Sequence, residues 1–467
     1  MAPSCYPPEY FRQLKVYVAP DNPAGRHLVD ALSASGVQVL GIIDNLKTGV
    51  DVINHAERAL PYDAVLIARS DYQPQIAAGM CERGFASDRI WCLQADGKHY
   101  QRYRIPSVLQ RWSQRLLSRL QRLPLLFPQL FTVYYAEKFV DSNVLVAFDY
   151  HQAIGSRVRL VVREPDREFH PEQCRYPWLG WLYLCCARVV VMDHESTNSL
   201  LNQLRQQRKL VQLWHGLPFK YLAGNKHFPH VLDHCFVSSS AWFNRHVFPQ
   251  MFKASSYLAL GYPRNDALVQ ISEARCWYNA LSAAQLQQLR QGRKLVLYMP
   301  TYRDNGKDQP PIDWLALDQL LQALGAVLVV KNHPFLAPFD ELRAQPDCTA
   351  IFHYPGRRNV YPWLADADLL LTDYSSVAFD FLGVDRPIIH FMYDLAEYRQ
   401  VRGQFLIDSE DFIAGDVATD FADLCQALQH NLTQDQHSEK RRLLREKFAI
   451  NTDVATPALV SYIEQLR

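Results

Sequence analysis

The sequence contains no apolar run long enough to cross a membrane. A spanning helix needs about 20 mostly apolar residues, and the closest candidate, residues 177–192, is interrupted by Arg188. The first residues, MAPSCYPPEYF, lack the basic and apolar regions of a signal peptide. We therefore expect a cytoplasmic protein without transmembrane segments, in which residues 177–192 form a buried helix followed by a strand.

Cysteine pairs with metal-ligand spacing are also absent. The 467 residues include ten cysteines but no CxxC pair, and Cys185 and Cys186 are adjacent. This usage is typical of buried thiols in a reducing compartment. A net charge of +1 excludes polyanion binding through bulk charge alone. A chain of this length is expected to hold about three domains.

Residues 14–98 alternate between short apolar runs and helical patterns. The apolar runs are LKVYVA, VQVLGIID, YDAVLIA and RIWCL. Such alternation predicts a small Rossmann-type α/β domain. No GxGxxG is present, so a dinucleotide site is not supported. We assign residues 1–105 to an N-terminal accessory domain with a structural or partner-docking role.

Acidic residues are absent between Asp96 and Glu137, where the sequence predicts a basic amphipathic helix. Its two faces carry Arg111, Arg115, Arg119 and Arg122 on one side and Leu109, Trp112, Leu116 and Leu120 on the other. Residues 106–123 could lie on an anionic membrane surface. Alternatively, the whole stretch 106–131 is an inter-domain linker whose apolar face packs on a neighbour. Nothing else in the sequence supports nucleic acid as a partner.

Four apolar runs further along the chain end in polar residues. The runs predict short buried strands. The polar residues that follow them are His215, Thr301, Arg303, Lys331, Asn332, His333, Asp373, Ser375 and Ser376. Ligands of open α/β sheets bind outside the carboxyl ends of the strands. Histidines, an arginine and a hydroxyl-rich turn at these ends therefore describe a site for a nucleotide diphosphate.

The last of these runs, LLLTDYSSVAFD (369–380), passes from a strand into a helix expected to close near Gly383. A helix N-terminus offers unpaired N–H groups and a partial positive charge, which favour phosphate. The alternative is an ordinary strand-to-helix turn with serine as the N-cap. The three other strand ends favour the phosphate interpretation.

Six motifs occur in a fixed order: WHGLPFK (214–220), GYPRND (261–266), PTYRD (300–304), KNHP (331–334), TDYSS (372–376) and FMYDLAEY (391–398). Over roughly residues 132–450, the chain resembles the CDP-glycerol glycerophosphotransferase family, which builds teichoic acids and related bacterial capsule or surface polymers. The resemblance implies an α/β protein with the GT-B fold, two Rossmann-like domains facing a cleft. We accordingly expect an acceptor-side domain over 132–258 and a CDP-binding donor domain over 259–467, whose last helix runs from Ser438 to about Phe448.

The resemblance also implies a reaction. A polyol phosphate, such as glycerol phosphate, passes from a CDP-linked donor to a hydroxyl of a saccharide or lipid-linked acceptor, and CMP leaves. His215 is the expected base, because imidazole titrates near neutrality. His333 is assigned to the pyrophosphate, where it also assists the departure of CMP. This places the protein in the cytoplasm or peripherally on the inner face of the membrane.

The remaining site residues divide between donor and acceptor. The expected donor-binding residues are Thr301, Arg303, His333, Asp373, Ser375 and Ser376. Asp373 is expected to fix the turn, or to orient His333 or Arg303, because it would repel phosphate. Gly216 and Lys220 are expected on the acceptor side.

No metal site or cofactor is expected. Asp366-Ala367-Asp368 is formally a DxD motif, but it precedes a strand, so we interpret it as a helix end. A loosely bound Mg²⁺ stays compatible with the sequence. Two alternatives remain: a GT-B glycosyltransferase that uses a nucleotide sugar, and a non-catalytic scaffold. A single catalytic module favours transfer of one unit over polymerisation.

Overall fold

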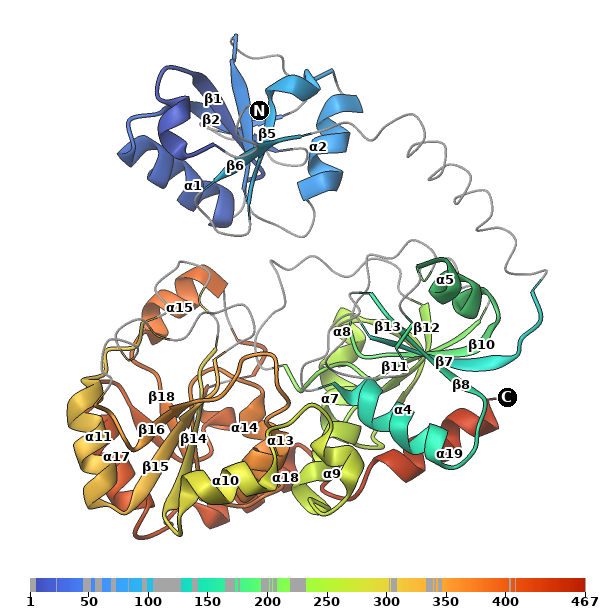
Figure 1. Ribbon diagram of the computed structural model, residues 1–467, viewed down its shortest axis with the longest axis vertical. Helices are drawn as coiled ribbons and strands as arrows, with labels where there is room; N and C mark the ends of the chain where they lie inside the picture. The colour runs from blue at the N-terminus through green and yellow to red at the C-terminus, as the bar shows by residue number, and fades with distance from the viewer. Residues whose placement is uncertain are drawn as a thin grey trace. The chain divides into compact units, whose positions relative to one another are not determined.

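A computed structural model describes residues 6–21, 23–44, 52–54, 61–68, 73–82, 84–94, 99–103, 127–136, 142–163, 173–174, 177–194, 201, 204, 208–218, 232–301, 303, 309–332, 339, 342, 347–402, 405–407 and 409–466. The chain divides into two compact units (Figure 1). The first comprises 1–118 with 303–307, and the second comprises 119–302 with 308–467.

The first unit contains one six-stranded sheet with the strand order β3-β2-β1-β4-β5-β6. Its strands are β1 (Lys15–Ala19), β2 (Gln38–Asp44), β3 (Val52–Asn54), β4 (Ala64–Ile67), β5 (Ile90–Leu93) and β6 (Tyr100–Arg102), with helices α1 (Pro23–Ala34) and α2 (Gln73–Glu82). Neighbouring strands are parallel except for β5 and β6. The four predicted apolar runs are thus β1, β2, β4 and β5 of a Rossmann-like sheet.

The second sheet has seven parallel strands in the order β13-β12-β11-β10-β7-β8-β9. They are β7 (Phe131–Ala136), β8 (Val158–Val162), β9 (Gln173–Cys174), β10 (Ala187–Met192), β11 (Lys209–Gln212), β12 (Leu232–Val237) and β13 (Lys253–Leu258). Helices of this region are α4 (Asn143–Ala153), α5 (Pro177–Cys185), α7 (Ala241–His246) and α8 (Phe248–Met251). The strand order reverses between β7 and β10.

The third sheet has six parallel strands in the order β16-β15-β14-β17-β18-β19. They are β14 (Lys294–Met299), β15 (Ala326–Val330), β16 (Ile351–His353), β17 (Leu369–Thr372), β18 (Ile388–Phe391) and β19 (Asp416–Ala418). Described helices are α9 (Asp266–Val269), α10 (Ala283–Arg290), α11 (Trp314–Ala323), α13 (Tyr361–Asp366), α14 (Val377–Phe381), α15 (Leu395–Arg402), α16 (Ser409–Phe412), α17 (Phe421–Asn431), α18 (Ser438–Lys447) and α19 (Thr456–Gln465). The order reverses between β14 and β17.

The second and third sheets belong to one compact unit and share an apolar core. For example, the ring of Phe243 on α7 packs edge-on against Phe379 on α14, with centroids 5.3 Å apart. Short 3₁₀ turns, η4 (Pro263–Asn265) and η5 (Ala274–Trp277), lie in the segment that leads from one sheet to the other. The fold is therefore the expected pair of Rossmann-like domains of GT-B type, in a chain that also carries the N-terminal sheet.

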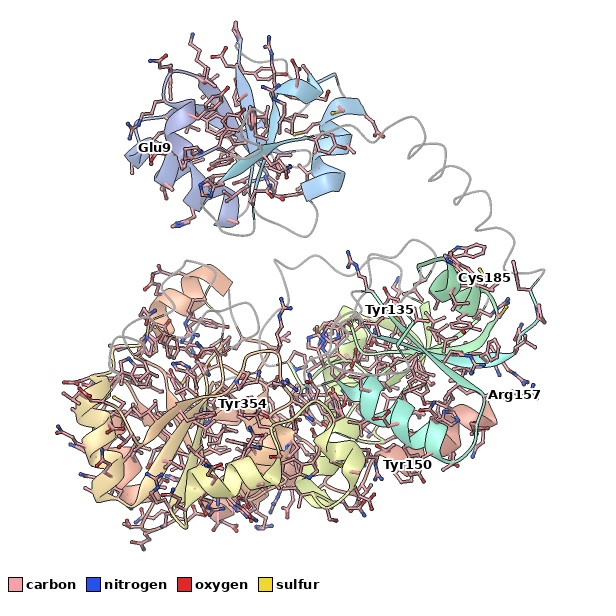
Figure 2. The ribbon with its side chains drawn as sticks, in the orientation of Figure 1. Glu9, Tyr135, Tyr150, Arg157, Cys185 and Tyr354 are labelled. Atoms are coloured by element: carbon pink, nitrogen blue, oxygen red, sulfur yellow. The ribbon has the colours of Figure 1, made fainter. Side chains whose placement is uncertain are left out.

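The expected buried helix within 177–192 is α5, but it is buried on one face only. Trp178 is 66% exposed, whereas Cys185 belongs to the same core as Tyr135 of β7 (Figure 2). A helix that covers one face of a sheet buries one stripe and leaves the other in solvent. The following strand, β10, is buried as expected.

The chain continues beyond α18 into a further helix, whereas the sequence predicts α18 as the last one. This helix, α19, buries Leu459 and Ile463 in the core of the second sheet, beside Val144 of α4 (Figure 1). Its apolar residues recur at helical spacing, which explains why it packs there. The range 259–467 is expected to form one donor domain, but its last helix packs against the second sheet instead.

Candidate active site

The strand order places two clusters of polar residues at the points where each sheet reverses. In open α/β sheets, such switch points form crevices at the carboxyl ends of the strands and bind ligands. In the third sheet, residues that follow β14 and β17 meet at this point. In the second sheet, residues that follow β10 meet the start of α4, which comes after β7.

At the third-sheet switch point, Asp373 holds the two neighbouring strand ends together. Thr301 donates to Oδ1 of Asp373 from its N–H at 2.9 Å and from its hydroxyl at 2.6 Å. The N–H of Tyr374 donates to the same oxygen at 2.5 Å. Asp373 is 1% exposed, so this buried carboxylate fixes the turn after β17.

The turn continues through Ser375 and Ser376 into α14. The N–H of Val377 donates to Ser375 Oγ at 3.4 Å, whereas Ser376 makes no side-chain cap hydrogen bond. The helix is short, ending at Phe381 rather than near Gly383. The serine pair therefore stands at a strand-to-helix turn, as the sequence predicts.

Ser376 lies against the WHG turn of the second sheet. Gly216 has a φ of +146°, and a Cβ added to it would lie 2.7 Å from Ser376 Oγ and 3.3 Å from Arg264 Nη2. Only glycine allows so close an approach without displacing a neighbour. The predicted acceptor-side and donor-side motifs thus meet at a single point of the second unit.

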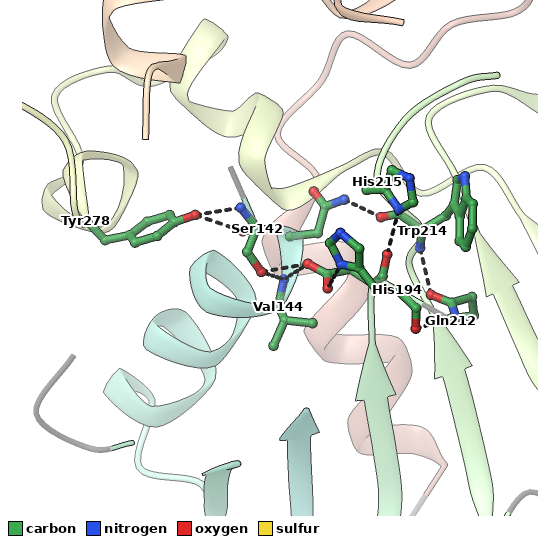
Figure 3. Close-up of polar contacts among 9 residues, drawn as sticks. Ser142, Val144, His194, Gln212, Trp214, His215 and Tyr278 are labelled. Atoms are coloured by element: carbon green, nitrogen blue, oxygen red, sulfur yellow. Dashed lines mark hydrogen bonds and ion pairs between the residues drawn. The ribbon is translucent and has the colours of Figure 1, made fainter. Parts of the chain in front are cut away.

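At the second-sheet switch point, a buried carboxylate accepts three hydrogen bonds (Figure 3). Asp193 follows β10 and is fully buried. Its Oδ2 accepts from Ser142 Oγ at 2.6 Å and from the N–H of Val144 at 3.2 Å, and its Oδ1 accepts from Nδ1 of His194 at 2.8 Å. Burial raises the pKa of Asp193, but His194 and the other two donors outweigh burial and lower it overall.

His215 follows β11 and forms a hydrogen bond with the backbone of the same aspartate. Its Nδ1 lies 3.2 Å from the carbonyl oxygen of Asp193 (Figure 3). A carbonyl only accepts, so Nδ1 carries the hydrogen and Nε2 keeps its lone pair. His194 stacks on His215 with ring centroids 4.5 Å apart and an interplanar angle of 15°.

Burial is the main cause that lowers the pKa of His215, to about 3, and His194 and Arg264 act in the same direction. The imidazole is therefore neutral at pH 7. A neutral ring with a free Nε2 lone pair is the form that accepts a proton from a hydroxyl. The negative charge of a bound phosphate would favour the imidazolium that results.

A buried ion pair lies beside this site. Arg264 Nη2 lies 2.7 Å from Asp380 Oδ2 on α14, and Tyr361 donates to the same oxygen at 2.7 Å. The N–H of Arg264 donates to Asn143 Oδ1 at 3.1 Å, and Asn143 Nδ2 donates to the carbonyl of Trp214 at 2.7 Å. This chain of contacts links α14 to the WHG turn.

The residues predicted from the sequence for this site did not include Ser142, Asn143, Asp193, His194, Arg264 or Asp380. The sequence did contain a signal for Asp193 and His194, because VVVMDH (189–194) is another apolar run that ends in polar residues. Arg264 stands within the GYPRND motif without an assigned role. Asn143 and Asp380 gave no signal, since their contacts come from segments far apart in the sequence.

Other predicted residues lie elsewhere. Lys331 is buried and donates to the carbonyl of Gly356 at 2.8 Å. Arg303 is buried and belongs to the first compact unit. His333, Lys220 and the predicted helix 106–123 lie outside the described residues.

The DxD carboxylates are both engaged by Arg290. Its Nη1 lies 2.6 Å from Asp366, and its Nη2 lies 2.7 Å from Asp368. This geometry supports the helix-end interpretation. In the part of the chain that the structure describes, no His, Cys, Asp and Glu group is placed to hold a metal ion. Over the same residues, no helix has the length and apolarity that membrane crossing requires.

Comparison with known proteins gives consistent matches. A family model described as CDP-Glycerol:Poly(glycerophosphate) glycerophosphotransferase matches residues 142–460. A teichoic acid ribitol-phosphate primase of Bacillus spizizenii is 25% identical over 70% of this chain and 87% of its own length. A teichoic acid poly(glycerol phosphate) polymerase of the same species is 26% identical over 49% of this chain and 63% of its own.

Two further matches extend the comparison. A teichoic acid ribitol-phosphate polymerase of Staphylococcus aureus is 26% identical over 65% of this chain and 60% of its own length. This chain therefore spans less than two thirds of either polymerase. The solved wall teichoic acid polymerase TagF matches with a TM-score of 0.59 and 21% identity, over 76% of this chain and 96% of that one, and supports the fold. The chain belongs to the CDP-glycerol:poly(glycerophosphate) glycerophosphotransferase family of enzymes.

Proposed function

We propose that this protein transfers a polyol phosphate from a CDP-linked donor to a hydroxyl of a saccharide or lipid-linked acceptor during synthesis of a teichoic-acid-like surface polymer. Relatives are named for glycerol phosphate and for ribitol phosphate, so the donor class is a CDP-polyol. TagF has also been solved as a histidine-to-asparagine variant soaked with CDPG. Family membership supports the reaction type.

The observation that carries the proposal is the contact between the WHG turn and the TDYSS turn. Gly216 and Ser376 approach so closely that a methyl group on the glycine would overlap the serine hydroxyl. His215 is adjacent to Gly216 and neutral. The proposed proton acceptor and the proposed phosphate-binding turn are therefore neighbours, which supports attack of a hydroxyl on a phosphate held between them.

In the proposed reaction, Nε2 of His215 takes the proton of the acceptor hydroxyl as its oxygen bonds to the distal phosphorus. The bond between that phosphorus and the bridging oxygen breaks, and its electron pair leaves on CMP. Ser375 and Ser376 hold phosphate oxygens. On the sequence alone, Arg303 and His333 are assigned to the pyrophosphate, and Lys220 is assigned to the acceptor side.

A thermal-shift screen with CDP-glycerol, CDP-ribitol, CMP, UDP-sugars and CMP-sugars tests the donor class. A ligand that binds the native state raises the unfolding midpoint by mass action. We expect shifts with CMP and at least one CDP-polyol, and the larger shift identifies the donor. A shift with a nucleotide sugar alone would overturn the proposal in favour of a glycosyltransferase.

The double variant Ser375→Ala with Ser376→Ala tests the phosphate site. Loss of hydrogen bonds to a charged group should weaken CDP-polyol binding about tenfold or more, measured by calorimetry. Ser272→Ala, which changes an exposed serine of the same unit, serves as the control. Unchanged affinity in the double variant would place the phosphates elsewhere.

A further inference from the structure

Asp193 holds two imidazoles at once through two different groups. Its carboxylate binds Nδ1 of His194 at 2.8 Å, and its carbonyl oxygen lies 3.2 Å from Nδ1 of His215. The two rings consequently stack, with centroids 4.5 Å apart. Figure 3 shows the pair beside the WHG turn.

The two rings are in unequal surroundings. The ring of His194 faces the buried carboxylate of Asp193. His215 faces the neutral carbonyl of Asp193. The described charged and titratable groups that act on it are His194, Arg264 and the carboxylate of Asp193, which already accepts three other hydrogen bonds. Arg264 is itself paired with Asp380. A positive charge on one of two stacked rings disfavours a positive charge on the other.

We propose that His194 is a positioning residue for His215: held by the carboxylate of Asp193, it stacks on the His215 ring, fixes the plane of that ring and disfavours a proton on it. This role rests on the proposed function of His215 as the base. Nε2 of His215 then remains ready for the hydroxyl proton. No described residue donates to that nitrogen.

The variant His194→Phe separates the two parts of this role, because phenylalanine keeps an aromatic ring in the stack but carries no proton. His194→Ala removes both the ring and the titratable group. The control is His246→Phe, which replaces an exposed histidine that packs on Trp242 away from the site. Near-ultraviolet circular dichroism confirms that each variant is folded.

The first readout is the ¹⁵N spectrum of labelled histidine during a titration from about pH 7 down to about pH 4.5. In the native protein, His215 should remain the neutral Nδ1–H form throughout. In His194→Phe, the pKa of His215 should rise, since the electrostatic effect of His194 that lowers it has been removed, so the ring begins to titrate. His246→Phe should match the native protein.

The second readout is the rate with a CDP-polyol at pH 7. We expect His194→Ala to lower kcat at least tenfold with KM for the donor little changed, and His194→Phe to fall between it and the native enzyme. A His215 spectrum that is the same in His194→Phe and the native protein would overturn the proposal, and so would full activity of His194→Ala. Because the spectrum needs no substrate, failure of this inference is distinguishable from failure of the proposed reaction.

Discussion

Trp214 has an unusual backbone conformation that sets the direction of His215. Its φ is 52°, a region that costs a residue with a side chain about 1–2 kcal/mol. Gln212 accepts from its N–H at 3.0 Å, and Asn143 donates to its carbonyl at 2.7 Å. These buried hydrogen bonds offset the strain and turn the imidazole toward Asp193.

Replacing His215 by alanine should lower turnover about 10²- to 10⁴-fold, the usual contribution of a positioned base. Donor affinity should stay within about threefold, because the phosphate contacts are assigned to the third sheet. Steady-state kinetics with a CDP-polyol, together with calorimetric binding, measure both quantities. His246→Ala is the control, and an active His215→Ala would remove this residue as the base.

Gly216→Ala should abolish most activity while leaving the protein folded. The new methyl group would meet Ser376 Oγ at 2.7 Å, so the two turns must separate. Gly155→Ala is a matched control, since Gly155 also has a positive φ, +84°, but has nothing within 4 Å of an added Cβ. Both should lose about 1–2 kcal/mol of stability through the positive φ, and Gly216→Ala should lose more because of the clash. Only Gly216→Ala should lose turnover.

At the scale of elements, the sheets decide which strand ends become neighbours. The runs that end in Thr301 and Asp373 are 72 residues apart in the chain, yet they join because β14 pairs with β17. The side chain of His390 on β18 also joins distant segments; we call its two contacts the His390 tie. Its Nδ1 faces the carbonyl of Asp373 at 3.3 Å, and its Nε2 accepts from the N–H of Ala414 at 3.1 Å.

This tie should make stability depend on pH. Burial lowers the pKa of His390 to about 4, whereas an unfolded histidine titrates near 6.5. Between these values the unfolded chain binds a proton that the folded chain does not, so acid favours unfolding. His390 should therefore cost the protein up to about 3 kcal/mol of unfolding free energy as the pH falls from about 6.5 to 4.

Urea unfolding of the native protein and of His390→Gln across this range measures the effect. The variant should be less stable at pH 8, where it loses the tie, but its stability should fall less steeply with acid. His246→Gln, at an exposed position, should keep the native slope. Equal slopes in His390→Gln and the native protein would contradict the assignment.

At the scale of the whole molecule, an apolar core unites the second and third sheets, and a buried ion pair holds the connecting segment against α14. Arg264 and Asp380 are 7% and 1% exposed at their side chains. Breaking such a pair leaves a buried charge without a partner and is strongly destabilising. The two Rossmann-like domains consequently form one compact unit. Helix α19 belongs to the same unit and packs in the core of the second sheet.

The membrane hypothesis for residues 106–123 also belongs to this scale. Replacing Arg111, Arg115, Arg119 and Arg122 together by glutamine should reduce binding to vesicles that contain anionic lipid. The loss should be greatest at low salt, because exposed charges are screened as salt rises. Vesicle co-sedimentation at two salt concentrations measures it.

A matched control changes the same number of charges elsewhere. The exposed arginines chosen for it are Arg157, Arg188, Arg245 and Arg357. This control should bind anionic vesicles like the native protein. If both quadruple variants lose binding equally, the effect is one of net charge; if neither does, residues 106–123 are not the anchor.

Much of the fold and part of the site could be predicted because their causes are local. Apolar runs of four to six residues became β11, β14, β15 and β17, and the polar residues after them stand at sheet edges. Asp193 and His194 also follow such a run but match no motif used for the prediction. Asn143 and Asp380 could not be found this way, since each acts on residues more than 70 positions away.

The sequence by itself determined the alternation of strands and helices, the order of the motifs and the candidates His215, Gly216 and Ser376. These depend on side-chain type and spacing, which are properties of neighbouring residues. The tertiary structure alone decided that Gly216 contacts Ser376, that Asp193 contacts two imidazoles and that α19 packs in the core of the second sheet. Such contacts join distant segments and exist only once strand order and burial have brought those segments together.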